Sequence, residues 1–449
     1  MSDFEFQNEE DKREFRRKRR VRNQILAYVS LVLILLVAGV GVFFAIKAGS
    51  AVMAEKEQQK LEEEALVQAM EEMTQTSEVE TEPETVIEEE ITTIEEYTDE
   101  ELLDEIVEAC ISEMPLEDKV AGLFIVTPEA LTGVDKAVRA GDGTKEALEK
   151  YPVGGLIYFK QNIKSKDQIT EMLANTVSMS KYPIFLAVDE EGAGVARVAD
   201  ALGLEKVDSA ADIGATGDAN NAYETYKEIG TYLTEYGFNL NFAPVADVLT
   251  EPDNDAIGDR SFGSDPTVVS AMVSSSVTAL EEVGVTACMK HFPGQGDADG
   301  DTHEGLAASD RTLEEIKETE LKPFAAGMEA GAQMIMVGHF TVPAIDEDNT
   351  PASLSKKVIT DLLREEMGYN GVVITDALNM SAISEYYDST QACIMAFKAG
   401  ADMVLMPEDF EAAYEGVLAA VKDGTISEAR INDSLRRVYR IKYKGTIDN

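Results

Sequence analysis

Short apolar runs that alternate with helix-length segments are the feature that most limits how this chain can fold. Strands buried on both faces read as continuous apolar runs, and alternation with helices brings such strands into a parallel sheet. The eight runs begin at Leu123, Gly155, Ile184, Phe238, Val285, Met334, Val372 and Met403. Stretches of helical character lie between most of them, at 165–180, 220–236, 266–283, 313–330, 356–367 and 389–399. The sequence predicts an α/β fold, a (β/α)8 TIM-like barrel within residues 98–449.

An open, doubly wound sheet is the alternative arrangement for the same alternation. Such a sheet often carries a Gly-x-Gly-x-x-Gly turn after its first strand, where it binds a dinucleotide. Here the first run is followed by Thr-Pro-Glu-Ala-Leu. The pattern favours the barrel, and we predict no cofactor.

The N-terminal region has the composition of a membrane anchor. Basic residues crowd 12–22, and 25–46 contains no charged residue. At about 1.5 Å per residue, a run of this length spans the roughly 30 Å core of a bilayer. We expect a cytoplasmic tail at 1–24 and a single transmembrane helix at 25–46, with the rest of the chain outside the cell membrane. A cleaved signal peptide is the alternative, although its apolar region usually has about 7 to 15 residues.

Residues 47–97 are rich in Glu, Thr and Ser and poor in aromatic residues. Such a segment cannot bury enough apolar surface to fold alone, so we expect a disordered, solvated stalk. Its apolar spacing at 55–73 is too brief to predict an oligomeric state. The net charge of −46 argues against nucleic acid as a partner, because phosphates would be repelled.

Polar residues stand at the ends of several predicted strands, on the rim where barrel enzymes build their sites. These residues are Asp189, Asn241, Asp247, Arg260, Lys290, His291, His339 and Asp376. Some have a purely structural alternative. Asp247 and Asp402 suit helix caps or turns, His339 suits a hydrogen-bonded rim position, and Arg260 and Lys290 suit structural ion pairs.

The chain has only three histidines, His291, His303 and His339. A zinc site is one use for them, but they lack the short His-x-x-x-His or Cys-x-x-Cys spacing of such sites, so no metal is predicted. His303 lies two residues after Asp301. In an extended loop the two side chains point to the same side, so Asp301 can orient the imidazole.

Several stretches together resemble the family 3 glycoside hydrolases, in particular their single-domain bacterial β-N-acetylglucosaminidase (β-N-acetylhexosaminidase) branch. The first is Lys-His-Phe-Pro-Gly-Gln-Gly-Asp at 290–297, followed by Asp-Thr-His at 301–303. Others are Asp-Glu-Glu-Gly at 189–192 with Arg197, the run 241–248, Arg-Ser-Phe-Gly at 260–263 and Ile-Thr-Asp at 374–376. The resemblance extends from about residue 116 to the C-terminus.

This resemblance implies the barrel fold and retaining hydrolysis of terminal β-linked N-acetylglucosamine through a covalent glycosyl-enzyme. Asp376 matches the nucleophile, and His303, oriented by Asp301, matches the general acid/base. The residues that match sugar-binding positions are Asp189, Arg197, Arg260, Lys290 and His291. The implied partner is a carbohydrate, such as a cell-wall muropeptide or a chitooligosaccharide.

The sequence departs from the family pattern at two places near the predicted site. Gln295 stands where the family commonly has histidine, and Ala193-Gly194 replaces the usual Gly-Arg. A β-glucosidase or β-xylosidase, a glycoside phosphorylase and an inactive, membrane-tethered sugar-binding module remain as alternatives. The last of these predicts substituted catalytic positions, whereas Asp301, His303 and Asp376 are all present.

Overall fold

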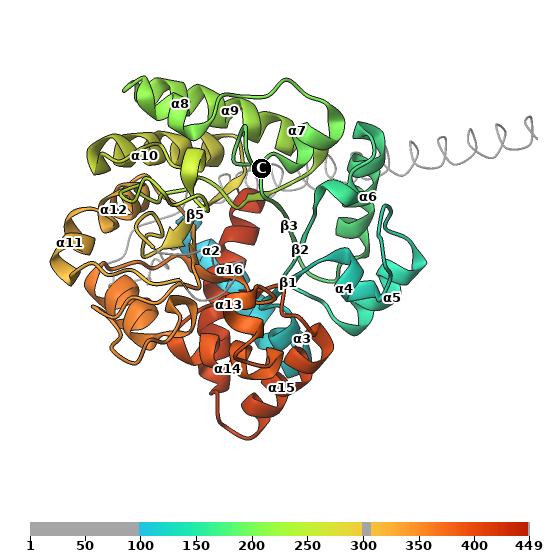
Figure 1. The fold of residues 1–449 in the computed structure, drawn as a ribbon. Helices are drawn as coiled ribbons and strands as arrows, with labels where there is room; N and C mark the ends of the chain where they lie inside the picture. The colour runs from blue at the N-terminus through green and yellow to red at the C-terminus, as the bar shows by residue number, and fades with distance from the viewer. Residues whose placement is uncertain (1–97, 299–306, 448–449) are drawn as a thin grey trace, which may run out of the picture. The chain divides into compact units, whose positions relative to one another are not determined.

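A computed structural model describes residues 98–298 and 307–447, and within them the chain forms a closed barrel of eight parallel strands (Figure 1). The strands are β1 (Phe124–Val126), β2 (Gly155–Ile157), β3 (Phe185–Val188), β4 (Leu240–Asn241), β5 (Thr286–Phe292), β6 (Met334–Val337), β7 (Val372–Ala377) and β8 (Met403–Leu405). Their order around the barrel follows the chain, and β8 pairs with β1. The predicted (β/α)8 barrel is confirmed. The predicted tail, anchor and stalk at 1–97 lie outside the described residues.

Helices surround the strands in Figure 1. They are α2 (Asp99–Glu113), α3 (Leu116–Ala121), α4 (Pro128–Thr132), α5 (Asp142–Lys150), α6 (Lys166–Met179), α7 (Arg197–Leu202), α8 (Ala210–Ala215), α9 (Ala219–Tyr236), α10 (Pro266–Glu282), α11 (Leu313–Glu318), α12 (Leu321–Glu329), η4 (Lys357–Glu366), α13 (Ser381–Ser384), α14 (Ser389–Ala399), α15 (Phe410–Lys422) and α16 (Glu428–Ile447). Short 3-10 turns lie at η1 (Lys160–Asn162), η2 (Gly258–Arg260) and η3 (Ala352–Leu354). None of the helices in the described part of the chain is long and apolar enough to span a bilayer.

The helix predicted at 313–330 is broken into α11 and α12. Pro323 explains the break, because a proline ring clashes with the carbonyl four residues earlier and has no N–H to donate to it. That carbonyl belongs to Thr319, which ends α11 with φ −122° and ψ −73°. The apolar periodicity is that of a helix on both sides, but the proline near the middle of the segment divides it in two.

The strands are buried, as continuous apolar runs require. Every residue of β1, β3, β5 and β6 is buried. In β7 the pattern changes at the carboxyl end, where Asp376 and Ala377 are partly exposed after four buried residues. The barrel interior is thus a packed core, and its carboxyl end opens to solvent at β7.

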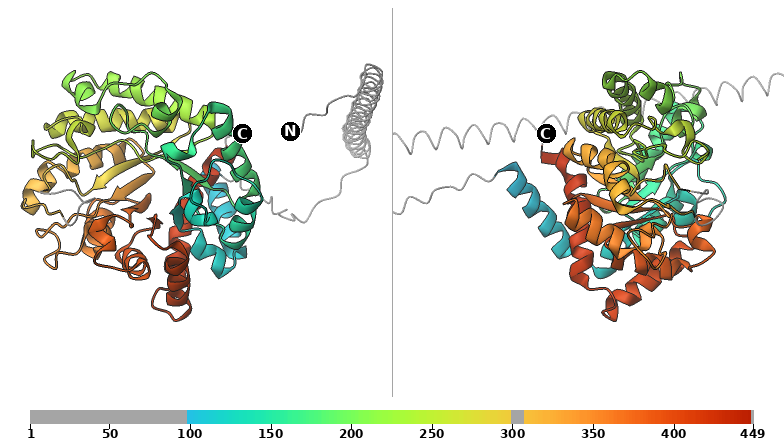
Figure 2. Two further views of the ribbon diagram at one scale, coloured as in Figure 1. Left: turned by 45° about the vertical axis from the view of Figure 1, so that its right-hand side comes forward. Right: turned by 60° about the vertical axis from the view of Figure 1, so that its left-hand side comes forward.

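The C-terminal helix α16 covers the opposite, amino-terminal end of the barrel. Lys442 Nζ donates to the carbonyl of Gly154, which directly precedes β2, at 2.8 Å. Arg430 Nη2 donates to the carbonyl of Ala401, just before β8, at 2.7 Å. Helix α2 runs beside α16 (Figure 2) and is joined to it by ion pairs. The N-terminal segment of the domain therefore packs at the end remote from the strand-end polar residues.

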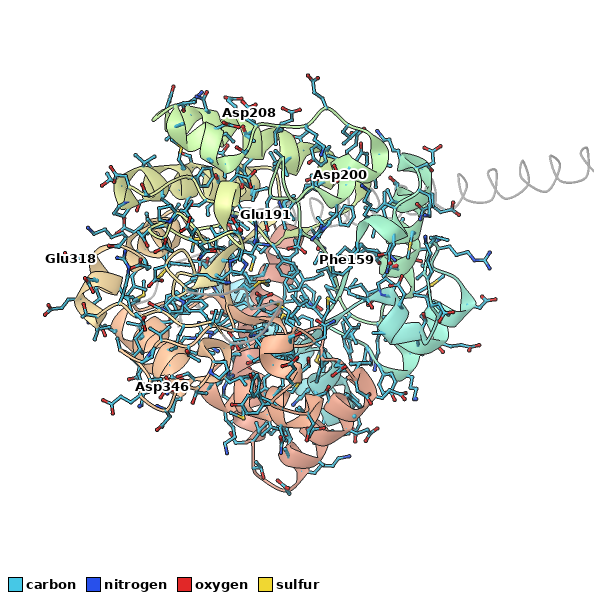
Figure 3. The ribbon with its side chains drawn as sticks, viewed as in Figure 1. Phe159, Glu191, Asp200, Asp208, Glu318 and Asp346 are labelled. Carbon is cyan, nitrogen blue, oxygen red and sulfur yellow. The ribbon has the colours of Figure 1, made fainter. Side chains whose placement is uncertain are left out.

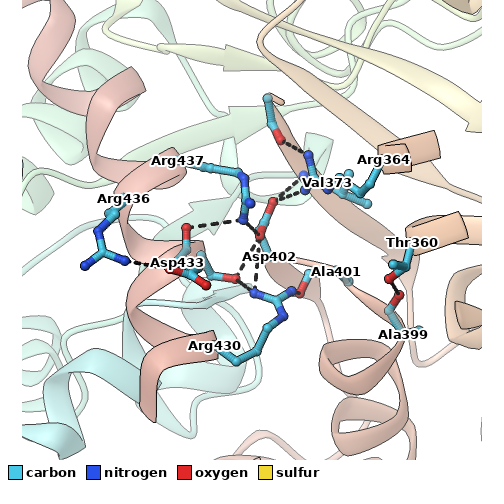
Figure 4. A network of polar contacts seen from close by, with 12 residues as sticks. Thr360, Arg364, Val373, Ala399, Ala401, Asp402, Arg430, Asp433, Arg436 and Arg437 are labelled. Carbon is cyan, nitrogen blue, oxygen red and sulfur yellow. Dashed lines mark hydrogen bonds and ion pairs between the residues drawn. The ribbon is translucent and has the colours of Figure 1, made fainter. Parts of the chain in front are cut away.

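Asp402 lies in the same amino-terminal layer and acts as a structural anchor (Figure 4). Its buried carboxylate pairs with Arg364, with Arg437 at 3.0 Å and with Arg430 at 3.6 Å. It also accepts hydrogen bonds from the backbone N–H of Val373, at 3.0 Å, and from a serine of α16. Asp402 is thus neither a helix cap nor a turn residue, but a hub that joins β7, η4 and α16.

Candidate active site

The predicted rim residues lie at the carboxyl ends of neighbouring strands. Asp189 directly follows β3, Lys290 and His291 are near the end of β5, and Asp376 is near the end of β7. Because all strands are parallel in a closed barrel, these ends face one mouth. Figure 3 shows Glu191 and Phe159 toward the middle of the ring of helices, whereas Glu318 and Asp346 lie at its edge.

A buried ion network links the loop after β3 to β5 and to η2. Lys290 Nζ contacts Asp189 Oδ1 at 2.7 Å and Glu191 Oε1 at 2.6 Å. Arg260 grips Glu191 in a bidentate pair, with Nε at 2.8 Å and Nη2 at 2.9 Å from the two carboxylate oxygens. Bidentate pairs of this kind fix geometry as well as charge. Both cations of the network are held in place by Glu191.

The network keeps its members charged. Burial raises the pKa of the Glu191 carboxyl, but the charges of Lys290 and Arg260 outweigh it, so the pKa lies far below its ordinary value. Burial lowers the pKa of the Lys290 ammonium, but Asp189 and Glu191 reverse the effect, and its pKa lies above the ordinary value. Lys290 is thus a cation at neutral pH, buried yet at the mouth.

His291 is oriented by Asp247. Its Nδ1 lies 2.8 Å from Asp247 Oδ2, so the ring donates the Nδ1 proton to this carboxylate. Asp247 Oδ1 accepts from the backbone N–H groups of His291, at 3.1 Å, and of Gln295, at 2.7 Å. The carboxylate therefore shapes the turn after β5 and also sets the tautomer of the imidazole.

Asp376 is a carboxylate at the mouth whose surroundings favour its ionised form. Burial raises its pKa, but interactions with His291 and His339 outweigh that effect, helped by the backbone N–H of Ala377 and by Lys290. The pKa therefore lies below its ordinary value. The Ala377 N–H donates to Asp376 Oδ1 at 2.7 Å. These electrostatic contacts bring Asp376 together with the two rim residues of β5.

Arg197 begins α7, and its guanidinium lies 5.9 Å from the centre of the Phe159 ring. Its Nε is buried and makes no hydrogen bond within the described part of the chain. Glu190 positions this helix, since its carboxylate accepts from the backbone N–H groups of Val198, at 2.7 Å, and Ala199, at 2.9 Å. The loop after β3 thus supplies Asp189 and Arg197 from two ends of one small turn.

His339 is a buried residue fixed within the rim. Its Nε2 donates to the carbonyl of Ala377 at 3.0 Å, and its Nδ1 lies 2.7 Å from Ser353 Oγ. These hydrogen bonds fit the structural alternative for His339, and its contact with the residue after Asp376 makes it a support for the carboxylate. In the residues that the structure describes, no group of three or more His, Cys, Asp or Glu side chains is placed to hold a metal.

Asp301 and His303 lie outside the described residues. The described residues on either side of this segment contact each other or the barrel mouth. On the C-terminal side, Ala308 pairs with Thr341, which follows β6. Ser309 Oγ donates to Asp297 Oδ2 at 2.5 Å. The two ends of the segment that carries the predicted acid/base are therefore joined at the mouth.

A buried carboxyl beside this junction gives a stability prediction. Burial raises the pKa of Glu320 to about 7, partly opposed by Arg311, whose Nε lies 3.4 Å away. Because this pKa is higher in the folded chain than its unfolded value near 4.5, the stabilising contribution of Glu320 is fully present below pH 4.5. The free energy of unfolding then falls as the pH rises through 7. The penalty above pH 7 is about 3 kcal/mol. We expect Glu320→Gln to raise the free energy of unfolding by roughly this amount at pH 8 and by much less at pH 4.5, measured by urea unfolding. An equal change at both pH values would contradict the assignment.

Two residues at the mouth, Glu191 and Asp247, have larger roles than their sequence context indicates. In the sequence Glu191 stands only within a motif, and Asp247 is equally well explained as a turn carboxylate. Their partners lie far along the chain, since 44 residues separate Asp247 from His291 and 69 residues separate Glu191 from Arg260. The local signal for Glu191 is its position two residues after Asp189, which places both side chains on one side of an extended segment.

Comparison with known proteins agrees with the geometry. Residues 115–441 match the family model described as the glycosyl hydrolase family 3 N-terminal domain. The β-hexosaminidase A of Pseudoalteromonas piscicida is 35% identical over 328 residues, covering 67% of this chain and 54% of that protein. The β-hexosaminidase of Nitrosomonas eutropha is 34% identical over 269 residues, covering 59% of this chain and 76% of that protein.

A similar solved structure is a family 3 β-N-acetylglucosaminidase from Paenibacillus sp. str. FPU-7. It has a TM-score of 0.71 and 35% identity, over 75% of this chain and 64% of that one. The chain thus spans about half the length of the Pseudoalteromonas relative and about two thirds of the Paenibacillus protein. The fold, the rim residues and these matches together place the chain in glycosyl hydrolase family 3.

Proposed function

We propose that this chain hydrolyses the bond to a terminal β-linked N-acetylglucosamine with retention of configuration. The observation that carries the proposal is Asp376, a partly exposed carboxylate at the end of β7 whose pKa is held below its ordinary value. An ionised carboxylate at the mouth suits attack on an anomeric carbon. The similar proteins are named β-hexosaminidases, which supports this substrate class over a plain glucoside.

In this proposal His303 protonates the leaving oxygen while Asp376 forms the glycosyl-enzyme. The same imidazole then removes a proton from the water that releases the sugar. Asp301 orients the ring. The sugar hydroxyl groups are bound by a set of rim residues, which contact them directly or hold the side chains that do: Lys290, His291, Asp189, Arg197 and Arg260. Such contacts strengthen as the sugar ring flattens toward the oxocarbenium ion.

The test is turnover of 4-nitrophenyl β-N-acetylglucosaminide beside 4-nitrophenyl β-glucoside. We expect the first to be hydrolysed much faster, with the β-anomer formed first in a proton NMR time course. His303→Ala removes the proton donor, so its loss of rate should be larger on a poor leaving group than on nitrophenolate. Product formation that requires phosphate would show a phosphorylase instead, and binding of the sugar without turnover would show a sugar-binding module.

We also propose that 25–46 anchors the protein in the cell membrane with the barrel outside, where glycans such as muropeptides or chitooligosaccharides are within reach. The run 25–46 has no charged residue and follows a basic cluster, which supports this orientation. Protease added to intact cells should then remove the barrel. A barrel that is degraded only after lysis would contradict this topology.

The Asp247–His291 pair gives a prediction for catalysis. Asp247→Asn replaces an acceptor-only carboxylate with an amide that can donate, so the imidazole loses its fixed tautomer. A charge-assisted hydrogen bond contributes about 1.5–3 kcal/mol, which corresponds to a decrease in kcat/KM of roughly 10–100-fold. Steady-state kinetics on the nitrophenyl substrate measure it. Wild-type kcat/KM in a folded variant would show that Asp247 serves the turn alone.

A further inference from the structure

A groove on the catalytic face of the barrel lies between the loops that follow β7 and β8. Its volume is about 790 Å3, within the size range of small-molecule sites. The segment from the end of α13 to the first turn of α14 contributes residues 384–391, and the segment that leads from β8 into α15 contributes residues 408, 409 and 412. Loops that follow the strands of a parallel barrel share the face of the carboxyl ends. The groove therefore opens on the same face as Asp376, and one of its walls belongs to the connection between β7, which carries this carboxylate, and α14.

An aromatic side chain stands exposed in this groove. Tyr386 is 56% exposed, although its backbone is fixed by a hydrogen bond from its N–H to the carbonyl of Ile383 at 3.0 Å. Tyr387 beside it is half-buried and packs against the core. An exposed tyrosine offers an apolar face together with a hydroxyl group, and because it has only two side-chain torsions it loses little conformational freedom on binding.

The charged side chains of the lining are all carboxylates, and a carboxylate accepts hydrogen bonds. Asp388 caps α14 by accepting from the backbone N–H of Gln391 at 2.8 Å, and Asp409 caps α15 by accepting from that of Ala412 at 3.0 Å. The carboxylates of Glu385 and Glu408 are exposed and cap no helix within the part of the chain that the structure describes. The lining contains no Lys or Arg. It would repel a carboxylate or phosphate and accept hydrogen bonds from hydroxyl groups.

We propose that this groove binds a neutral saccharide unit of the aglycone, one or more residues beyond the bond that is cleaved. Tyr386 supplies the stacking face, and Glu385 and Glu408 accept hydrogen bonds from sugar hydroxyls. The proposal builds on the proposed function, because the groove is useful only if the first sugar is bound at the mouth. It assigns the chain a preference for extended glycans over single glycosides.

The test compares a short and a long substrate in the full chain. Wild-type turnover of 4-nitrophenyl β-N-acetylglucosaminide decides the proposed function by itself. For the groove, Tyr386→Ala should decrease kcat/KM for chitotetraose about 10-fold and leave kcat/KM for the nitrophenyl substrate unchanged. Glu408→Gln should decrease the chitotetraose value about 3-fold. The matched control is Val177→Ala, which also truncates an exposed apolar side chain but lies near the end of α6.

Three outcomes would overturn the groove assignment. An equal decrease in kcat/KM for both substrates in Tyr386→Ala would show a general role at the mouth. An unchanged kcat/KM for both would show that the groove binds no part of the substrate. A loss confined to substrates that carry a lysine-containing peptide, with chitotetraose unaffected, would show that the acidic lining binds a cationic peptide instead. A second measurement uses Asp376→Asn as the background, where calorimetry should find that Tyr386→Ala weakens chitotetraose binding by a similar factor without any turnover.

Discussion

Asp376→Asn is expected to decrease kcat by at least about 10^4-fold on the nitrophenyl substrate, the order of loss seen when a residue of a covalent catalytic unit is removed. An amide has no anionic oxygen to form the glycosyl-enzyme, while its size and its hydrogen bond from the Ala377 N–H are retained. Substrate affinity should persist, so calorimetry with chitobiose should give a Kd within a few-fold of the substrate KM of the wild-type chain. Steady-state and single-turnover kinetics measure the loss.

A further arm tests the covalent step. Added azide should restore part of the turnover in Asp376→Asn by attacking the anomeric carbon directly, and should give a product of the opposite anomeric configuration. His339→Gln serves as a comparison, because it alters a support of the same carboxylate without removing the nucleophile. Residual activity in Asp376→Asn close to that of His339→Gln would remove the nucleophile assignment.

The barrel was predictable because its signal is distributed and periodic. Each strand is a continuous apolar run, and the helices between them have caps and apolar spacing that can be read locally. The structure differs from the predicted elements where a single residue overrides the apolar pattern. Pro323 breaks the helix predicted at 313–330, and Pro244, which has no N–H, follows a fourth strand that is only two residues long.

The site was predictable only as a set of positions. Strand-end placement located Asp189, Lys290, His291 and Asp376, since parallel strands must present their carboxyl ends together. Which carboxylate pairs with which cation depends on contacts across the barrel, and these have no local signature. Asp402 illustrates the point. Its place directly before the run that begins at Met403 indicates the amino-terminal end of the barrel, but nothing in its sequence context predicts the arginines that pair with it.

The consecutive acids at 189–191 show how the backbone divides roles among similar side chains. In an extended segment alternate side chains point to opposite sides. Asp189 and Glu191 both reach Lys290, whereas Glu190 turns away and accepts from the hydroxyl of Tyr232 at 2.7 Å and from the first turn of α7. Three carboxylates in a row thus serve two roles, because Asp189 and Glu191 hold Lys290 at the mouth and Glu190 positions a helix.

Glu191→Gln is expected to decrease the free energy of unfolding by about 3–5 kcal/mol, because breaking a buried ion pair leaves its cations without compensation. Lys290 retains Asp189, but Arg260 loses its only carboxylate partner within hydrogen-bonding distance among the described residues. The penalty should be largest at neutral pH, where the Glu191 carboxyl is ionised because its pKa is far below the ordinary value. Urea unfolding measures the stability.

The same substitution should raise KM, since Lys290 and Arg260 are no longer fixed at the mouth and must be ordered by the substrate. A matched control is Glu411→Gln, which removes an equivalent charge from the exposed pair with Lys150, where N and O are 3.0 Å apart. Exposed pairs contribute only about 0–1 kcal/mol, so this control should unfold nearly as the wild-type chain does. If both variants lose the same small amount, the ion network holds neither the fold nor the site, and the order of the mouth must come from backbone packing alone.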